Sequence, residues 1–426
     1  MKTTQHFFNL LLCALTFCMV SCGNESSSQP QNDTTEVKDE QYRQQAQQLA
    51  HDYIIVDGHV DLPYRLTVQN FQLTRKYLGI PIETDEGDFD FKRAKEGGLD
   101  APFMSIYIPA SYQTGGAKKF ADGLIDMVTA IADSIPDNFT IASTPAEVES
   151  IVKAGKIALP MGMENGAPIE DDLANVKYFR DRGISYVTLT HSKNNQICDS
   201  SYDTTRLWNG LSDFGRDVVA EMNRVGIMVD ISHVSDSTFY QVMKLSKAPV
   251  IASHSSARYF TPGFERNMSD DMIEKLGKND GVIMINFGST FVDEASRNHY
   301  DAMSDTLKQI LAAKGLTDED STAKPIIEQF KIDHPTLFAD VEKVADHIDH
   351  VVKLAGVDHV GFGSDYDGVG DSLPTGLKDV SDYPNLIYVL LKRGYSSEDI
   401  QKICYGNVFR VWNKVLEVSK DLQKQS

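Results

Sequence analysis

The sequence predicts an α/β fold of the (β/α)8 TIM-barrel type, and three observations lead to this prediction. Apolar, β-rich runs recur eight times along the chain. They are nearly continuously apolar, as is typical of parallel strands buried on both faces. Longer amphipathic stretches with helix-capping signals separate them, and repeated strand–helix units build such barrels. An open doubly wound sheet is the alternative, but the glycine-rich phosphate loop that often follows its first strand is missing here.

The N-terminal segment predicts export. Lys2 precedes an apolar run at residues 7–20 that is too short to cross a bilayer, so residues 1–21 are a predicted signal peptide. The run ends in "MVSC", which resembles a bacterial lipobox and implies cleavage before Cys22 and acylation of its thiol. An ordinary signal peptide that contains a cysteine is the alternative. Because Gly23 and not aspartate follows, we expect an exported lipoprotein with its lipid anchor in the outer membrane.

The charge and cysteine content exclude several classes of protein. Lys and Arg total 41 and Asp and Glu total 61, for a net charge of −20. Nucleic acids and anionic membrane surfaces need a basic footprint, so nucleic acid is not an expected partner. Once Cys13 and Cys18 leave with the signal peptide and Cys22 is acylated, Cys198 and Cys404 remain. Two cysteines do not make a disulfide scaffold, and whether they pair stays open.

The mature chain is predicted to be a tether followed by one domain. Residues 22–42 are polar and nearly free of large aliphatic residues, which is typical of a flexible tether. Residues 43–426 form the predicted barrel domain, which opens with a short helix near residues 43–53. The eight predicted strands lie at residues 53–61, 103–109, 157–164, 186–192, 227–233, 250–256, 282–288 and 360–367. Pro160 is expected to weaken the third or to place a bulge there.

Capping signals mark helices between these strands. Thr144 with Pro145 and Glu147 predicts one helix start, and Ser396 with Asp399 predicts another. A third helix is expected to begin after Ser212 and to close at Gly226. Residues 289–345 form a long insertion between strands seven and eight that is rich in charge and helix formers.

Six of the eight predicted strands end in a histidine, aspartate or glutamate. In a barrel these ends meet at the face that carries the active site. Imidazole and carboxylate together suit zinc, and the set has too many ligands for one tetrahedral ion. Two zinc ions bridged by a carboxylate, with an activated water between them, would serve hydrolysis of an amide or ester. The strand-end residues are His59 and Asp61, Glu164, His191, His233, His254, and Asp365.

Several assignments stay open on the residues alone. Asp365 and Asp367 are equal candidates by spacing, and Asp57 either supports His59 or closes a turn. His347 and His350 are three residues apart on a predicted helix away from the barrel mouth, so a structural role is favoured. The segment "GFGSDYDG" does not have the spacing of a calcium-binding EF-hand. Trp208 and the segment 201–210 are weak candidates for the pocket wall.

Ordered motifs link the sequence to a known family. They are "DGHVDLP" (57–63), "GMENG" (162–166), "VTLTHS" (187–192), "DISHVS" (230–235), "PVIASHSSAR" (249–258), "ERNMSDD" (265–271) and "HVGFGSDYDG" (359–368). Through them the chain resembles the membrane (renal-type) dipeptidases, metallopeptidase family M19. The similarity runs from about residue 50 to the C-terminus.

The resemblance implies a role for each site residue. His59 and Asp61 would bind one zinc ion, His233 and His254 the other, and Glu164 would bridge them. Asp365 would bond to the bridging hydroxide and pass its proton to the leaving amine. His191 would stabilise the oxyanion, and Arg266 would grip the terminal carboxylate of a dipeptide. The expected activity is therefore hydrolysis of free dipeptides, extending to those with a C-terminal D-residue, and a homodimer is a further expectation.

The sequence departs from the vertebrate relatives at the pocket walls. Lys193 stands where a vertebrate relative has cysteine, and the segments 83–91 and 289–345 do not follow vertebrate lengths. An N-acyl amino acid deacylase would share the barrel and metals, although many such enzymes bridge their metals with a lysine carbamate from strand four. A surface-anchored binding protein without catalysis is the alternative from another class, and the intact ligand set argues against it.

Overall fold

Eight parallel strands close into a barrel in the computed structural model, which describes residues 32–68, 79–318 and 320–425. The strands follow one another around the barrel in the order β1-β10-β9-β8-β7-β6-β5-β2. All eight predicted strands are present, so the barrel is confirmed and the open sheet is excluded. Their bounds are β1 Ile55–Val60, β2 Leu99–Tyr107, β5 Met161–Glu164, β6 Ile184–Thr188, β7 Met228–Asp230, β8 Ile251–Ser255, β9 Val282–Ile285 and β10 Val360–Phe362.

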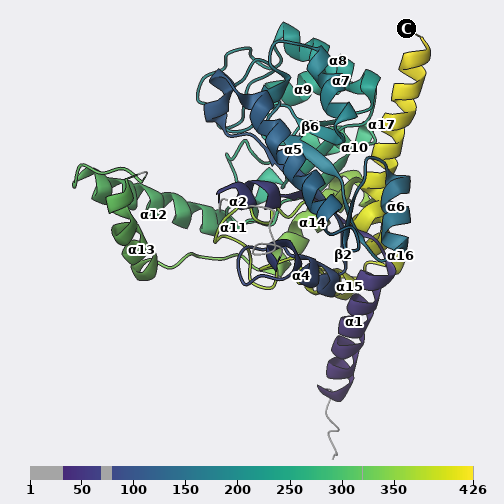
Figure 1. Ribbon diagram of the computed structural model, residues 1–426. Coiled ribbons are helices and arrows are strands. Elements are labelled where there is room, and N and C mark those ends of the chain that lie inside the picture. The colour runs from purple at the N-terminus through teal and green to yellow at the C-terminus, as the bar shows by residue number, and fades with distance from the viewer. Residues whose placement is uncertain (1–31, 69–78, 319, 426) are drawn as a thin grey trace, which may run out of the picture.

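Helices follow the strands along the chain and cover the outside of the barrel (Figure 1). Serine caps hold α8 and α9, as Ser212 and Ser235 each accept a backbone N–H from the first turn. Ser396 and Asp399 form the predicted reciprocal capping box. The helices are α2 Leu62–Val68, α3 Gly79–Ile82, α4 Phe91–Gly97, α5 Ala117–Ser134, α6 Pro145–Lys153, α7 Ala174–Asp181, α8 Asp213–Val225, α9 Asp236–Leu245, α10 Asp270–Lys278, α14 Val341–Ala355, α15 Tyr383–Lys392, α16 Ser397–Gln401 and α17 Asn407–Lys424.

Pro160 divides the third predicted strand in two. β4 (Ile157–Leu159) leaves the barrel and pairs with β3 (Phe139–Ile141), while β5 continues into the barrel. Proline lacks the N–H that a central strand needs, so the break falls where the sequence predicted a weak point. The division leaves Glu164 at the C-terminal end of β5.

The bottom of the barrel is closed by the C-terminal helix. Inward-facing residues of the strands pack against α17, where Trp412 is fully buried and its ring lies 5.2 Å from that of Phe103. Phe103 in turn lies 5.3 Å from Tyr186. This apolar filling occupies the lower half of the barrel, so polar strand-end residues are left to the upper face.

The insertion after β9 forms an arm. It consists of α11 (Ser289–Val292), α12 (Glu294–Ala312) and α13 (Lys324–Asp333), and α12 and α13 project away from the barrel (Figure 1). The root of the arm is tied to the core. His347 on α14 accepts the backbone N–H of Ala257 at 2.9 Å and donates to the Val292 carbonyl at 3.0 Å.

The N-terminal helix is longer than predicted. α1 spans Asn32–Asp52, so residues 32–42, which the sequence assigned to the tether, are helical. Part of α1 packs on Tyr388 of α15. The Tyr388 hydroxyl donates to Asp39, and the Tyr388 ring lies 4.2 Å from the Arg43 guanidinium. The predicted signal peptide at 1–21, Cys22 and the tether up to residue 31 lie outside the described residues. No helix in the described ranges is long and apolar enough to cross a membrane.

Candidate active site

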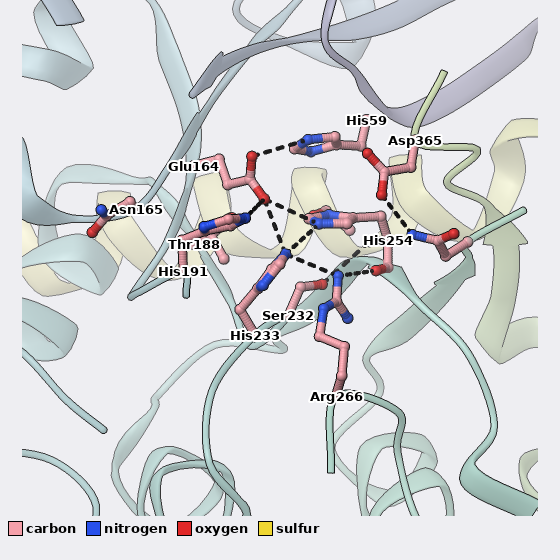
Figure 2. A network of polar contacts seen from close by, with 12 residues as sticks. His59, Glu164, Asn165, Thr188, His191, Ser232, His233, His254, Arg266 and Asp365 are labelled. Carbon is pink, nitrogen blue, oxygen red and sulfur yellow. Dashed lines mark hydrogen bonds and ion pairs between the residues drawn. The ribbon is translucent and has the colours of Figure 1, made fainter. Parts of the chain in front are cut away.

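The strand-end residues predicted from the sequence meet at one face of the barrel (Figure 2). Three overlapping groups of side chains could each hold a metal ion, and every predicted ligand belongs to at least one of them. The groups are His59, Glu164 and His254; Glu164, His191 and His233; and His59, Asp61 and Asp365.

Glu164 lies at the centre of this cluster, and its two oxygens face different histidines. Oε2 is 3.4 Å from His59 Nε2, whereas Oε1 is 3.0 Å from His233 Nε2 and 3.2 Å from His254 Nε2. Asp61 Oδ2 lies on the first side, 3.4 Å from His59 Nε2. A carboxylate with one oxygen toward each set of ligands has the arrangement of a bridge between two metal positions.

Tyr186 orients His59 from inside the barrel. The Tyr186 hydroxyl lies 2.9 Å from His59 Nδ1 and donates to the Gly58 carbonyl at 2.9 Å. Gly162 makes room for this tyrosine, because a Cβ there would lie 1.9 Å from the tyrosine ring. Asp57, which the sequence left undecided, accepts the His59 backbone N–H at 2.8 Å and a hydroxyl hydrogen bond from Tyr383. Asp57 therefore supports His59 and does not itself face the cluster.

A buried carboxylate supports the second pair of histidines. Asp230 accepts the Ser253 hydroxyl at 2.6 Å, and the same hydroxyl oxygen lies 2.8 Å from His254 Nδ1. Asp230 also accepts the Thr188 hydroxyl at 2.5 Å. Contacts of this kind set the ring orientation and leave Nε2 as the free ligand atom.

The site backbone is strained at two of the predicted residues. His233 has φ +66° and Asp365 has φ +64°, in the left-handed region that side chains other than glycine rarely adopt. Such conformations cost about 1–3 kcal/mol each and gather at functional sites. Asn286 also fixes Asp365, donating to its Oδ2 at 2.7 Å.

Burial and mutual charge set the protonation of the cluster. Burial lowers the pKa of both His233 and His254 well below the usual value, and nearby cations, Arg266 among them, add to this. Burial raises the pKa of Glu164, but His59 and His191 outweigh it and hold that pKa well below its ordinary range. Burial raises the pKa of Asp365 to about 7. His233 and His254 are thus neutral beside an ionised Glu164, and these are the forms that bind metal. At His59 burial lowers the pKa, but Tyr186, Glu164 and Asp61 outweigh it and hold that pKa well above its usual value.

The donor set has the chemistry of a metal site. His59 Nε2 and Asp61 Oδ1 are buried and have no hydrogen-bond partner among the described residues. The Nε2 atoms of His233 and His254 lie 2.9 Å apart beside Glu164 Oε1, so they converge on one position. Buried polar atoms without partners are costly unless something binds them. Nitrogen and carboxylate-oxygen ligands suit zinc and other metals that bind imidazole.

A cavity of about 710 Å³ opens above the cluster. Its floor carries Asp61, Glu164, His191, His233 and Asp365. Its walls come from α2, the end of β2, α11, α12 and loops; they include Tyr64, Tyr107, Tyr202, Phe291, Arg297, Tyr300 and Val369. The weakly predicted segment 201–210 therefore contributes Tyr202, whereas Trp208 bonds to the Asn195 carbonyl outside this lining.

Arg266 is buried beside the second pair of histidines (Figure 2). Its Nη2 donates to the His254 carbonyl at 2.7 Å and lies 3.0 Å from His233 Nε2, and Nη1 donates to the Ser255 hydroxyl at 2.8 Å. Nε has no partner among the described residues. The structure thus brings Arg266 to the predicted metal ligands, whereas its contact with a substrate stays a prediction.

The remaining candidates have structural surroundings. Asp367 lines the cavity, but it forms an ion pair with Arg65 at 3.3 Å, accepts the Asp88 N–H at 2.7 Å and belongs to none of the three groups that could hold a metal ion. His347 is buried between α11 and the loop after β8, and His350 pairs with Asp270 at 2.8 Å. Cys198 and Cys404 are both buried and free.

Three supporting residues were missed by the sequence prediction: Tyr186, Asp230 and Asn286. A signal existed for Asn286, because it follows one of the two strands that do not end in a histidine or a carboxylate. The other such strand ends at Tyr107, which lines the cavity with its ring 4.8 Å from that of His191. All eight strand ends therefore supply a side chain to the site or its cavity.

The comparison with known families gives a match over the whole barrel. Residues 43–426 match the family described as membrane dipeptidase, peptidase family M19. A dipeptidase, tcpJ, of Claviceps purpurea is 33% identical over 375 residues, which cover 85% of this chain and 77% of the fungal protein.

Solved structures agree with this match. The probable dipeptidase PvdM from Pseudomonas aeruginosa is 25% identical with a TM-score of 0.75, over 89% of this chain and 99% of the other. A metallopeptidase from Rhodobacter sphaeroides, solved with a phosphinate mimic of the dipeptide L-Ala-D-Ala, is also 25% identical. Its TM-score is 0.69, over 85% of this chain and 99% of that one.

Proposed function

Because the chain belongs to the membrane dipeptidase family, peptidase family M19, we propose that it is a binuclear zinc dipeptidase that hydrolyses free dipeptides, including those with a C-terminal D-residue. The observation that carries the proposal is Glu164, whose two oxygens face two separate sets of ligands. His59 and Asp61 would hold one ion, and His233 and His254 the other. When bound, such ions acidify a water and polarise the scissile carbonyl.

The side chains around this centre can carry the remaining steps. Asp365, fixed by Asn286, is placed to accept a proton and to pass it to the leaving amine. His191 lies 3.6 Å from Glu164 Oε1 and faces the cavity, where its imidazole can donate to the developing oxyanion.

Arg266 would restrict the substrate to free dipeptides. A guanidinium cannot donate to a nitrogen that binds a cation, so the contact with His233 must be given up when the site is loaded. The freed N–H and the Nε that has no partner among the described residues would then be available to bind a carboxylate as a planar fork. A longer peptide would place an amide there instead of a charge.

The test is hydrolysis by the purified protein of Ala–Ala, Ala–D-Ala, an amidated dipeptide, a tripeptide and an N-acetyl amino acid. We expect cleavage of the two free dipeptides, lost with a chelator and restored by zinc. Arg266→Ala should lower kcat/KM for free dipeptides far more than for the amidated one, and equal losses would refute the clamp. Cleavage of the acetylated amino acid alone would identify a deacylase. Two bound zinc ions without any turnover would refute the dipeptidase.

The N-terminal prediction is part of the same proposal. We propose that Cys22 is acylated and anchors the enzyme in the outer membrane of a bacterial cell, a reading that rests on the "MVSC" motif and Gly23. Incorporation of labelled palmitate into the wild-type protein, and its loss in Cys22→Ala, is the expected result. Equal labelling of both proteins would refute acylation at this residue.

A further inference from the structure

The insertion arm supplies one positive charge to the wall of the cavity. Arg297, in the first turns of α12, lines the cavity together with Tyr300 and Asp301 of the same helix. Its side chain is 28% exposed, so it faces the cavity without being freely solvated. The cavity floor is otherwise rich in carboxylates, so a cation at this position gives the wall a charge opposite to that of the floor.

The guanidinium of Arg297 is held in place but keeps its donors free. It stacks on the Phe264 ring, with its central carbon 3.5 Å from the ring centroid. Its Nε lies 3.6 Å from Asp301 Oδ2 in an i,i+4 ion pair. Among the described residues, its two Nη groups make no hydrogen bond. A stacked guanidinium with an open fork is pre-oriented for a carboxylate.

Arg297 and Arg266 lie on the same side of the site. Phe264 precedes Arg266 by two residues, and its ring lies 5.8 Å from that of Phe291. The Arg266 guanidinium carbon is in turn 5.6 Å from the Phe291 centroid. The two aromatic rings therefore connect the buried arginine to the one at the cavity wall.

We propose that Arg297 makes this enzyme prefer dipeptides with a carboxylate side chain on the C-terminal residue. The inference rests on the proposed function, in which Arg266 holds the α-carboxylate of that residue. The α-carboxylate and the side chain leave the same Cα, so a side chain of aspartate or glutamate length extends from Arg266 along Phe291 toward Arg297.

The other charged residues of the cavity wall are less suited than Arg297 to bind the substrate side chain. Asp301 could attract a cationic side chain, but it is 53% exposed and is therefore more strongly screened by water and salt. Arg65 also lines the cavity, but its two Nη groups already donate to the Glu86 and Phe89 carbonyls and Nη1 pairs with Asp367, so its buried Nε is the donor that has no partner among the described residues. Arg297, by contrast, keeps both Nη groups free of hydrogen bonds within the described part of the chain and can offer the two parallel donors that a carboxylate binds.

The test compares substrates that differ only in charge. Hydrolysis of Ala–Glu and of Ala–Gln is measured for the wild type, for Arg297→Met and for Arg297→Lys. Lys308→Met is the matched control, because Lys308 lies on the same helix, is 73% exposed and is absent from the cavity lining. Ala–Lys is included to detect a dominant effect of Asp301.

We expect the wild type to favour Ala–Glu over Ala–Gln, and the ratio of their kcat/KM values to fall about tenfold in Arg297→Met. Lys308→Met should leave the ratio unchanged, and Arg297→Lys should keep part of it. Hydrolysis of both substrates with no preference for Ala–Glu, a preference for Ala–Lys, or an equal fall in the control would overturn this inference alone. If no dipeptide is hydrolysed, the proposed function fails and this inference with it.

Discussion

His347 gives a prediction that depends on no metal. Its ring is buried between α14, α11 and the loop after β8, with Phe260 packed at 4.4 Å between ring centroids. Burial lowers the pKa of His347 from 6.5 to about 4, and Lys343 and His350 add to this while Asp293 opposes it. Its Nδ1 accepts the Ala257 N–H, a bond that exists only while that nitrogen is unprotonated.

The sign and size of the effect follow from this difference. The unfolded chain binds a proton near pH 6.5 and the folded chain only near pH 4, so the unfolded state holds more protons between these values. Stability is therefore lost as the pH falls through this window. A difference of about 2.5 pKa units corresponds to about 3 kcal/mol at pH 4, relative to pH 7.

The assay is equilibrium urea unfolding between pH 4 and pH 7.5. His347→Asn removes the titration but keeps an acceptor for the Ala257 N–H, so it should be less stable at pH 7 and lose less stability on acidification. His334→Asn, at an exposed histidine of the arm, is the control and should follow the wild type. Because other acid-sensitive groups are common to all three proteins, they cancel in the difference. Parallel curves for wild type and His347→Asn would refute the assignment of a buried neutral imidazole.

Three further substitutions test the site. Glu164→Gln replaces the carboxylate, which turns one oxygen toward each set of proposed ligands, with an amide. The zinc content should fall from two ions per chain to one or fewer, and kcat should fall by more than about 100-fold. Unchanged metal content and rate would exclude the bridge. Tyr186→Phe removes the contact with His59 Nδ1 and should weaken zinc affinity about 10–100-fold, as measured by competition with a chelator. An unchanged affinity would show that packing alone orients the His59 ring. Gly368→Ala places a Cβ 2.2 Å from both Asp61 Oδ2 and Asp365 Oδ1, which must then move. Activity should be lost while the unfolding midpoint stays close to that of the wild type. Full activity would mean that these carboxylates can move without affecting catalysis.

The cluster of strand-end residues could be predicted from the sequence because its members lie at or just after the C-terminal ends of six strands, whereas the role of each in metal binding was implied by the family resemblance. Parallel strands in a barrel point their C-terminal ends to one face, so the order of motifs alone brings His59, Glu164 and His254 together. The break at Pro160 could also be predicted, because a proline has no N–H to donate to a neighbouring strand and so interrupts the pairing. These predictions needed only the backbone register.

The supporting contacts could not be predicted in the same way. Tyr186 lies within a strand and reaches His59 across the barrel interior, in space that depends on Gly162 having no side chain. Asp230 reaches His254 through Ser253, which belongs to the neighbouring strand. Such contacts depend on which inward-facing side chains meet across the barrel, and the periodicity of a single strand does not contain that information.

The proposed metal ligands and the cavity wall depend on different parts of the chain. The proposed ligands belong to strand ends whose positions are fixed by the closed hydrogen-bonded barrel. Arg297 belongs to an arm whose root is held by His347 through Ala257 and Val292. A change in the length or sequence of that arm would therefore alter the wall cation without moving Glu164. Substrate preference can diverge on this fold while the chemistry at the strand ends stays the same, which is why the arm, and not the ligand motifs, is the place to look for the specificity of this enzyme.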